Sequence, residues 1–206
     1  MLDGGCVLDT LAQKRGAGKR PGPPVHDDLV KRQFTAERPN QLWLTDITEH
    51  WTDQGKVYCC AIKDVYSNKI VGYSISDRMK SRLAVDALDS AARRRGRPDV
   101  VAVCVAHSDR GSQIRSRKFV TAINRNELRG SMCRVGAAGD NAAMESFFAL
   151  LQKSVLSRRR WTTRGELRQA IVAWIERTYH HRRRQARLGR LTPVEFETIY
   201  AAASAA

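Results

Sequence analysis

Three acidic residues stand where ordinary chain architecture gives little reason for a carboxylate. Asp46 lies in the middle of WLTDIT, a pattern typical of a β-strand, although strand interiors disfavour Asp. Asp109 follows the apolar run VVAVCVA, in the stretch HSDRGSQ, and Glu145 lies within a largely apolar helical pattern. Two neighbouring strands and one helix can bring three such side chains to one point, so we interpret these acids together.

A trio of carboxylates suits phosphoryl transfer that depends on bound Mg²⁺. Mg²⁺ prefers carboxylate oxygen ligands, and two ions about 3.5–4 Å apart can activate an attacking oxygen and stabilise a leaving one. Each acid also has a plain structural interpretation, because strand-end carboxylates form turns or cap helices and Glu145 fits a solvated helix face. The sequence predicts catalytic and metal-binding roles for all three: Asp46, Asp109 and Glu145.

The segments around these acids predict a mixed sheet. Residues 41–51, 57–65 and 69–76 have the pattern of three strands in hairpin succession, with TDQGK as a turn. Residues 81–96 have helical periodicity, so the apolar strand at 99–106 is reached through a helix and can lie parallel to an earlier strand. A short helix, a fifth strand and a longer helix are expected at 116–126, 128–133 and 140–155. The expected class is α/β, with a mixed five-stranded sheet flanked by helices.

Composition divides the chain into three parts. Residues 1–38 are rich in Gly, Pro and charge and predict a flexible basic arm or linker. Residues 39–156 form the expected catalytic core, and residues 157–206 a basic helical C-terminal extension. In that extension, Thr192 and Glu195 are spaced as a capping box that opens a last helix.

The charge balance indicates a polyanionic partner. Lys and Arg number 36 against 21 Asp and Glu, which gives a net charge of +15, and eleven Arg but no Lys lie between Val155 and Arg190. Each cation set against a phosphate releases condensed counterions, so nucleic acid is the first candidate. Trp161 adds a stacking surface beside the arginines, and His180 and His181, next to a run of three arginines, are interpreted as part of a basic, phosphate-facing helix end. The residues predicted to bind nucleic acid are Lys153, Arg158, Arg159, Arg160, Trp161, Arg182, Arg183 and Arg184.

Other settings have less support in the sequence. No stretch reaches the roughly 18 apolar residues that a membrane span requires, and the N-terminus lacks the apolar core of a signal peptide. The five cysteines include no CxxC pair, so buried free thiols are a better interpretation than zinc ligands or disulfides. We expect a cytoplasmic protein without a membrane partner.

Several motifs, in order, resemble the catalytic core of bacterial insertion-sequence transposases of the DDE type, which is similar to retroviral integrase. They are WLTDIT, DVYSNKIVGYSI, HSDRGSQ, GDNAAMESFF and LGRLTPVEF, with 35 residues between Asp109 and Glu145. The resemblance covers roughly residues 33–200. It implies a ribonuclease-H-like fold, with Asp46, Asp109 and Glu145 as ligands of Mg²⁺ or Mn²⁺, two ions in number.

The resemblance also implies a bacterial, nucleoid-associated protein, its partners and an activity. DNA, both element ends and target, would be the substrate for strand cleavage and strand transfer, and the chain would act as a homo-oligomer. A helix-turn-helix segment, which such elements often encode upstream or separately, has no counterpart in residues 1–38. It is therefore expected in a partner or an upstream fusion segment. A truncated remnant that only binds DNA and a ribonuclease-H-like nuclease are the alternatives.

Three residues are expected to support the site. Asn141 precedes Glu145 by four residues, one helical turn, and could orient its carboxylate or simply start the helix. His107 lies two residues before Asp109, and a structural hydrogen bond is favoured over a catalytic role. Gln152 stands seven residues after Glu145, where many family members carry Lys or Arg, and can donate a hydrogen bond to phosphate but supplies no charge.

Overall fold

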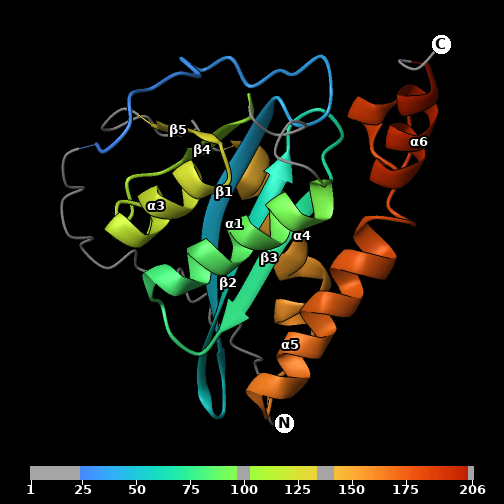
Figure 1. Cartoon of the computed structure of the whole chain (residues 1–206). Helices are drawn as coiled ribbons and strands as arrows, with labels where there is room; N and C mark the ends of the chain where they lie inside the picture. Colours follow the sequence, from blue (N-terminus) through green and yellow to red (C-terminus); the bar gives the residue numbers. More distant parts are fainter. Residues whose placement is uncertain (1–23, 97–102, 134–141, 204–206) are drawn as a thin grey trace, which may run out of the picture.

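A five-stranded mixed sheet forms the centre of the protein (Figure 1). The computed structural model describes residues 24–96, 103–133 and 142–203. The strand order is β3-β2-β1-β4-β5, which puts β1 in the middle. The strand bounds are Leu42–Thr52 for β1, Gly55–Asp64 for β2, Ile70–Ser76 for β3, Val105–Ser108 for β4 and Arg129–Met132 for β5. The expected α/β fold with a mixed five-stranded sheet is confirmed.

The first three strands form the predicted antiparallel meander. β1 pairs with β2 from Trp43–Asp64 to Thr52–Gly55, and β2 pairs with β3. The β1–β2 turn ends at Gly55, whose φ of 105° lies in a region that favours glycine. These contacts are local in sequence, which is why alternation and turn residues were enough to predict them.

Helical connections produce the parallel part of the sheet. Helix α1 (Ser81–Arg95) leads from β3 towards β4, and α3 (Arg117–Arg125) leads from β4 to β5. β4 is parallel to both β1 and β5, as a crossover through a helix allows. The fourth strand was expected at 99–106; in the described residues it extends from Val105 to Ser108, and residues 97–102 lie outside them. Asp109 therefore directly follows the strand.

The last third of the described chain is helical. Its elements are α4 (Ala142–Ser154), the 3₁₀ turn η1 (Leu156–Arg158), α5 (Arg164–Ala173), the π-helical turn η2 (Trp174–Tyr179), the 3₁₀ turn η3 (Ala186–Leu188) and α6 (Pro193–Ala203). The predicted capping box is present at the start of α6. The Glu195 carboxylate accepts a hydrogen bond from Thr192 N at 2.9 Å, and Glu195 N donates to Thr192 Oγ1 at 3.2 Å.

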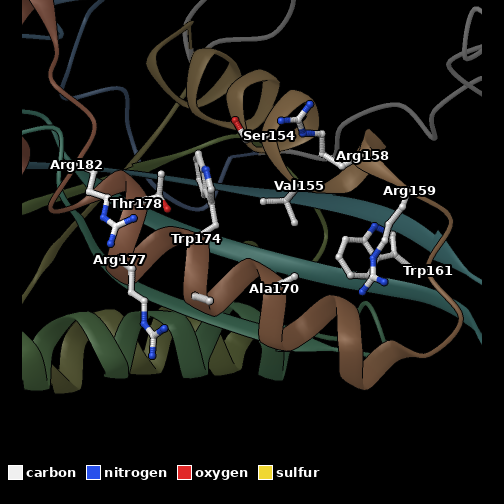
Figure 2. Close-up of a pocket in the computed structure, with 11 residues that line it drawn as sticks. Ser154, Val155, Arg158, Arg159, Trp161, Ala170, Trp174, Arg177, Thr178 and Arg182 are labelled. Atoms are coloured by element: carbon white, nitrogen blue, oxygen red, sulfur yellow. The ribbon is translucent and has the colours of Figure 1, made fainter.

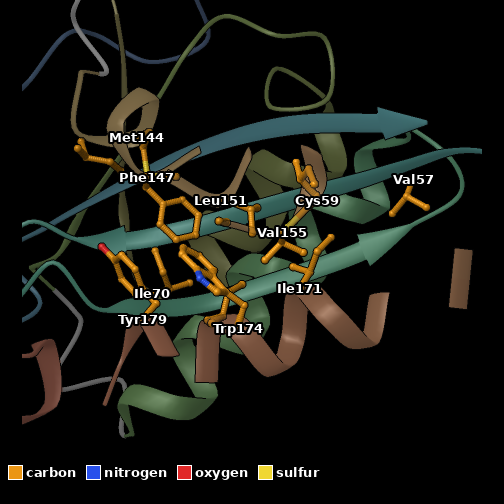
Figure 3. Close-up of a cluster of buried hydrophobic side chains, with 14 of the residues drawn as sticks. Val57, Cys59, Ile70, Met144, Phe147, Leu151, Val155, Ile171, Trp174 and Tyr179 are labelled. Carbon is orange, nitrogen blue, oxygen red and sulfur yellow. The ribbon is translucent and has the colours of Figure 1, made fainter. Parts of the chain in front are cut away.

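Helices cover both faces of the sheet and form two separate cores. On one face, α1 and α3 pack against β-strand residues such as Cys60. On the other face, α4, α5 and η2 enclose Cys59 and an aromatic group formed by Phe147, Trp174 and Tyr179 (Figure 3). The adjacent cysteines thus point to opposite faces, as strand alternation requires. Cys59, Cys60, Cys104 and Cys133 are buried thiols that form no disulfide, as predicted, while Cys6 lies outside the described residues.

Part of the predicted N-terminal arm contacts the sheet. Met132 N in β5 donates to Asp27 O at 3.3 Å, Leu29 N donates to Ser131 Oγ at 3.0 Å, and Val30 is buried. The division of the chain at residue 38 stays a prediction. Within the described segments, no helix is both long and apolar enough to cross a bilayer.

Candidate active site

The sheet register brings two of the three predicted acids side by side. β1 and β4 pair in parallel as far as Thr45 and Ser108. The next residues are Asp46, within β1, and Asp109, directly after β4, so both follow the last positions at which the two strands pair. Neighbouring strands lie about 4.8 Å apart. The two carboxylates therefore project from adjacent points at one end of the β4 strand.

Asp46 is an acid without a cationic partner among the described residues. Burial, with smaller contributions from the nearby carboxylates of Asp109 and Glu145, raises the pKa of the Asp46 carboxyl to about 7, against the opposing effect of the hydrogen bond from Ile47 N. That hydrogen bond is 2.8 Å long. No Lys or Arg of the described segments forms an ion pair with Asp46. The site thus has an excess of negative charge around a partly buried acid.

Helix α4 supplies the third acid because its other face is anchored in the core. Met144, Phe147 and Leu151 are buried against the sheet. Glu145 lies in the first turn, next to this buried row, and is exposed. The field of its carboxylate reaches Asp46, since it contributes to the raised pKa of that residue.

Asp109 also has a local structural role. Its Oδ1 accepts a hydrogen bond from Gly111 N at 3.0 Å, the arrangement of an Asx turn. In residues 24–96, 103–133 and 142–203, no three His, Cys, Asp or Glu side chains lie close enough together to hold a metal ion. Convergence of Asp46, Asp109 and Glu145 on one ion therefore stays a prediction.

The three supporting residues have different surroundings. His107 is buried, with Nδ1 2.9 Å from Ser131 Oγ and Nε2 3.2 Å from Cys133 Sγ, which matches the structural interpretation. Gln152 Nε2 donates to Ser157 Oγ at 2.6 Å on an exposed surface. Asn141 lies outside the described residues.

The three consecutive arginines that follow α4 differ in how they are paired. Arg160 forms an ion pair of 2.7 Å with Asp53. Arg159 lies over the ring of Trp161, 4.3 Å from its centroid, and 3.8 Å from Glu166 (Figure 2). Trp161 has only 5% of its surface exposed and donates from Nε1 to Leu156 O, so little of its ring is open for the predicted stacking on a base.

The second arginine group, Arg182 to Arg184, lies near Lys153. Lys153, Arg183 and Arg184 line one cavity, whereas Arg182 lines the pocket drawn in Figure 2. Arg184 is paired with Glu195 at 3.3 Å. Sequence reasoning missed a further cation of that cavity, Lys63, although a lysine within the apolar run VYCCAIKDV was a usable signal.

His180 corrects one interpretation of the basic C-terminal segment. His180 and His181 were expected at a phosphate-facing helix end, but His180 is only 2% exposed. Its Nε2 accepts a hydrogen bond from Ile70 N at 3.1 Å, and burial lowers its pKa to about 4, against an opposing effect of Glu176. It is a neutral core residue, because the sheet needs an acceptor at the start of β3.

Solved structures define the class of this fold. The chain is similar to the catalytic core of human T-cell lymphotropic virus 2 integrase, solved with magnesium, with a TM-score of 0.59 at 18% identity over 79% of this chain and 99% of that one. It is also similar to a chain of the simian T-cell lymphotropic virus intasome, with a TM-score of 0.63 at 20% identity over 86% and 61% of the two chains. The architecture is that of integrase catalytic cores, a ribonuclease-H-like fold.

The sequence matches this class through two family models described as integrase core domains, over residues 36–138 and 126–193. The chain belongs to the integrase core domain family. It is 39% identical over 176 residues to transposase InsF for insertion sequence IS3A of Escherichia coli, covering 85% of this chain and 60% of that protein. An IS600 protein of Shigella sonnei is 38% identical over 177 residues, 86% and 64% of the two chains. This chain thus spans less than two thirds of these relatives' length.

Proposed function

We propose that this chain is the catalytic part of an insertion-sequence transposase that cleaves DNA strands and joins them to target DNA in a metal-dependent reaction. One observation carries the proposal. Asp46 follows the last residue paired with β4, beside Asp109, and the carboxylates of Asp109 and Glu145 both raise its pKa. The Asx turn accounts for Asp109 alone; it gives no reason for three acids close together, whereas a divalent cation would offset their charge.

The donor set fits Mg²⁺ or Mn²⁺. All three donors are carboxylates, which are the ligands that hard divalent cations prefer, and two of them are exposed enough to exchange water. Asp46, Asp109 and Glu145 would together hold two ions. When bound, such ions supply the Lewis acidity that ionises an attacking oxygen and stabilises the leaving one.

The protein's own contribution is to position these groups and the DNA. The paired strands β1 and β4 fix Asp46 and Asp109, and the buried face of α4 fixes Glu145. The unpaired cations, with a net charge of +15, attract DNA by counterion release. Lys153, Arg158, Arg182 and Arg183 are the predicted DNA ligands that form no ion pair within the described segments.

We further propose that the chain acts as a homo-oligomer on paired element ends. Recognition of those ends would need a helix-turn-helix segment on a partner or upstream of this chain. This follows from the family likeness, since relatives such as InsF are transposases and the solved integrase cores include dimeric and trimeric forms.

A strand-transfer assay with precut element ends tests the proposed function. With Mg²⁺, the wild-type protein should join ends to a target duplex, and Asp46→Asn and Asp109→Asn should each lower product to background. Asp86→Asn is the matched control, because Asp86 is a half-buried acid on α1 paired with Arg82. Degradation without joining would indicate the nuclease alternative, and DNA binding without any reaction would indicate a remnant.

A further inference from the structure

A strongly basic cavity lies beside α4, on the helix that carries Glu145. We call it the basic hollow; its volume is about 590 Å³, within the range of small-ligand sites. Five cations line it, while no Asp or Glu of the described residues does: Lys63, Lys153, Arg183, Arg184 and Arg187. Because like charges repel, five cations that line one cavity without an acid are suited to binding an anion.

Lys63 is the most unusual member of the basic hollow. It is only 6% exposed, and its Nζ donates to Ala143 O at 3.1 Å. No carboxylate of the described segments forms an ion pair with it. Burial, together with the nearby guanidinium of Arg187, lowers its pKa to about 8. A buried cation without a counter-ion costs stability, and that cost is offset when an anion binds.

The other cations are free to meet the same anion. Within the described residues Lys153, Arg183 and Arg187 form no ion pair, and only Arg184 is engaged, by Glu195. The wall of the hollow also contains Asn68, whose buried Oδ1 has no hydrogen-bond partner in the described chain. A free acceptor beside several donors suits a nucleotide better than a bare phosphate ion, because base edges carry N–H donors.

The position of the hollow indicates which nucleotide it would meet. Ser146, directly after Glu145, lines it, as do Leu150 and Lys153 further along α4. From Ser146 to Lys153 the helix rises about 10 Å. Successive nucleotides of a DNA strand are about 3.4 Å apart along the duplex axis. A strand that lies at the acidic site can therefore continue along α4 with its next phosphates at the hollow.

We propose that the basic hollow is a binding site for the backbone phosphates of the DNA strand held at the acidic site, with Lys63 and Arg187 as its central ligands. This inference rests on the proposed function, since it takes the occupant to be the DNA on which the acids act. The hollow extends the substrate contact beyond the arginine clusters that the sequence indicated. Lys63 acts there as a fixed point charge inside the fold, whereas Arg187 reaches in from the surface.

Salt-dependent DNA binding tests the assignment. Labelled duplex binding would be followed by fluorescence anisotropy in EDTA over several salt concentrations, for wild type, Lys63→Met and Arg187→Met. Each substitution should lower the slope of log K against log salt by about 0.9, the value of one phosphate contact. Lys118→Met is the matched control: it removes the same charge from an exposed position on α3, on the other face of the sheet, and should leave the slope unchanged.

Measurements of thermal stability and of binding to a free nucleotide complete the test. Lys63→Met should keep or raise the melting temperature, because it removes a buried unpaired cation; if it unfolds the protein, the exposed Arg187→Met decides alone. If Lys63→Met and Arg187→Met have the same slope of log K against log salt as Lys118→Met, the proposal is wrong. Loss of deoxyadenosine monophosphate binding with unchanged DNA binding would overturn it as well, in favour of a free nucleotide. Strand transfer by the wild-type protein is measured in a separate assay. If the binding data contradict a phosphate site in the basic hollow, the proposed function is unaffected. If the proposed function is wrong, the strand-transfer assay shows it.

Discussion

A buried aspartate and a partly buried one, on neighbouring strands, have opposite surroundings. Asp64, the last residue of β2, is 0% exposed and accepts hydrogen bonds from Asn40 N and Tyr66 N, both at 2.8 Å. Arg95 of α1 pairs with it at 3.2 Å. Asp46 on β1 has one backbone hydrogen bond and two other carboxylates nearby.

The difference separates a structural acid from a candidate functional one. Burial raises the pKa of Asp64, but Arg95 and the two N–H donors oppose that rise. The same Arg95 also binds Glu197 of α6, so Asp64 belongs to a network that joins β2, α1 and α6. In the part of the chain that the structure describes, no cation pairs with Asp46 in a comparable way. A charge that the fold satisfies holds the fold together, whereas a charge left unsatisfied is available to a ligand.

The largest effect is expected from Asp64→Ala. It leaves two buried N–H groups without an acceptor and Arg95 with only Glu197, so we expect a loss of about 3–5 kcal/mol in unfolding free energy. Urea denaturation would measure it. Asp64→Asn, which keeps one acceptor, should cost less. If Asp64→Ala were as stable as wild type, the contrast between the two aspartates would fail.

The pH dependence of the unfolding free energy tests the effect of burial at another residue, His180. His180 has a pKa lowered from 6.5 to about 4, so between these values the unfolded chain binds more protons than the folded one. Stability should therefore fall as the pH drops through this window, by about 3 kcal/mol in all. In His180→Gln, denaturation curves at pH 4.5 and 7 should differ less than in wild type. His181→Gln, at an exposed position, should behave as wild type.

Asp46→Asn should have the opposite sign from Asp64→Ala. It removes a partly buried charge that two other acids repel, so the unfolding free energy without metal should hold or rise by about 1 kcal/mol. Strand transfer should nevertheless be lost. The same urea denaturation series measures the stability, and a clear destabilisation would mark Asp46 as a structural acid.

The smallest effect concerns the cations. Arg158→Ala should lower the salt slope of DNA binding by about 0.9, since Arg158 forms no ion pair in the described chain. Arg160→Ala should lower it less, because Asp53 competes with phosphate for that guanidinium at 2.7 Å. Equal slopes for the two variants would show that a surface ion pair of this kind does not hold the side chain back from DNA.

Local pattern was enough for much of this fold. Strand alternation and turn residues predicted the β1–β2–β3 meander, helical periodicity predicted α1, and the capping box at Thr192 and Glu195 formed as expected. Ordered motifs also indicated the family, which the family models confirm. These features depend on contacts between residues close in the chain or on the motif order itself.

The tertiary structure decided the surroundings of each charge. The sequence singled out Asp46 and Asp109, but only the parallel pairing of β1 with β4 sets them side by side. It did not single out Asp64 or Lys63, nor indicate that His180 and Trp161 are buried. Their partners, Arg95, Ala143, Ile70 and Leu156, lie in other elements or across turns. Whether a charge is buried or paired depends on groups brought together from distant parts of the chain, and a linear pattern does not encode those distances.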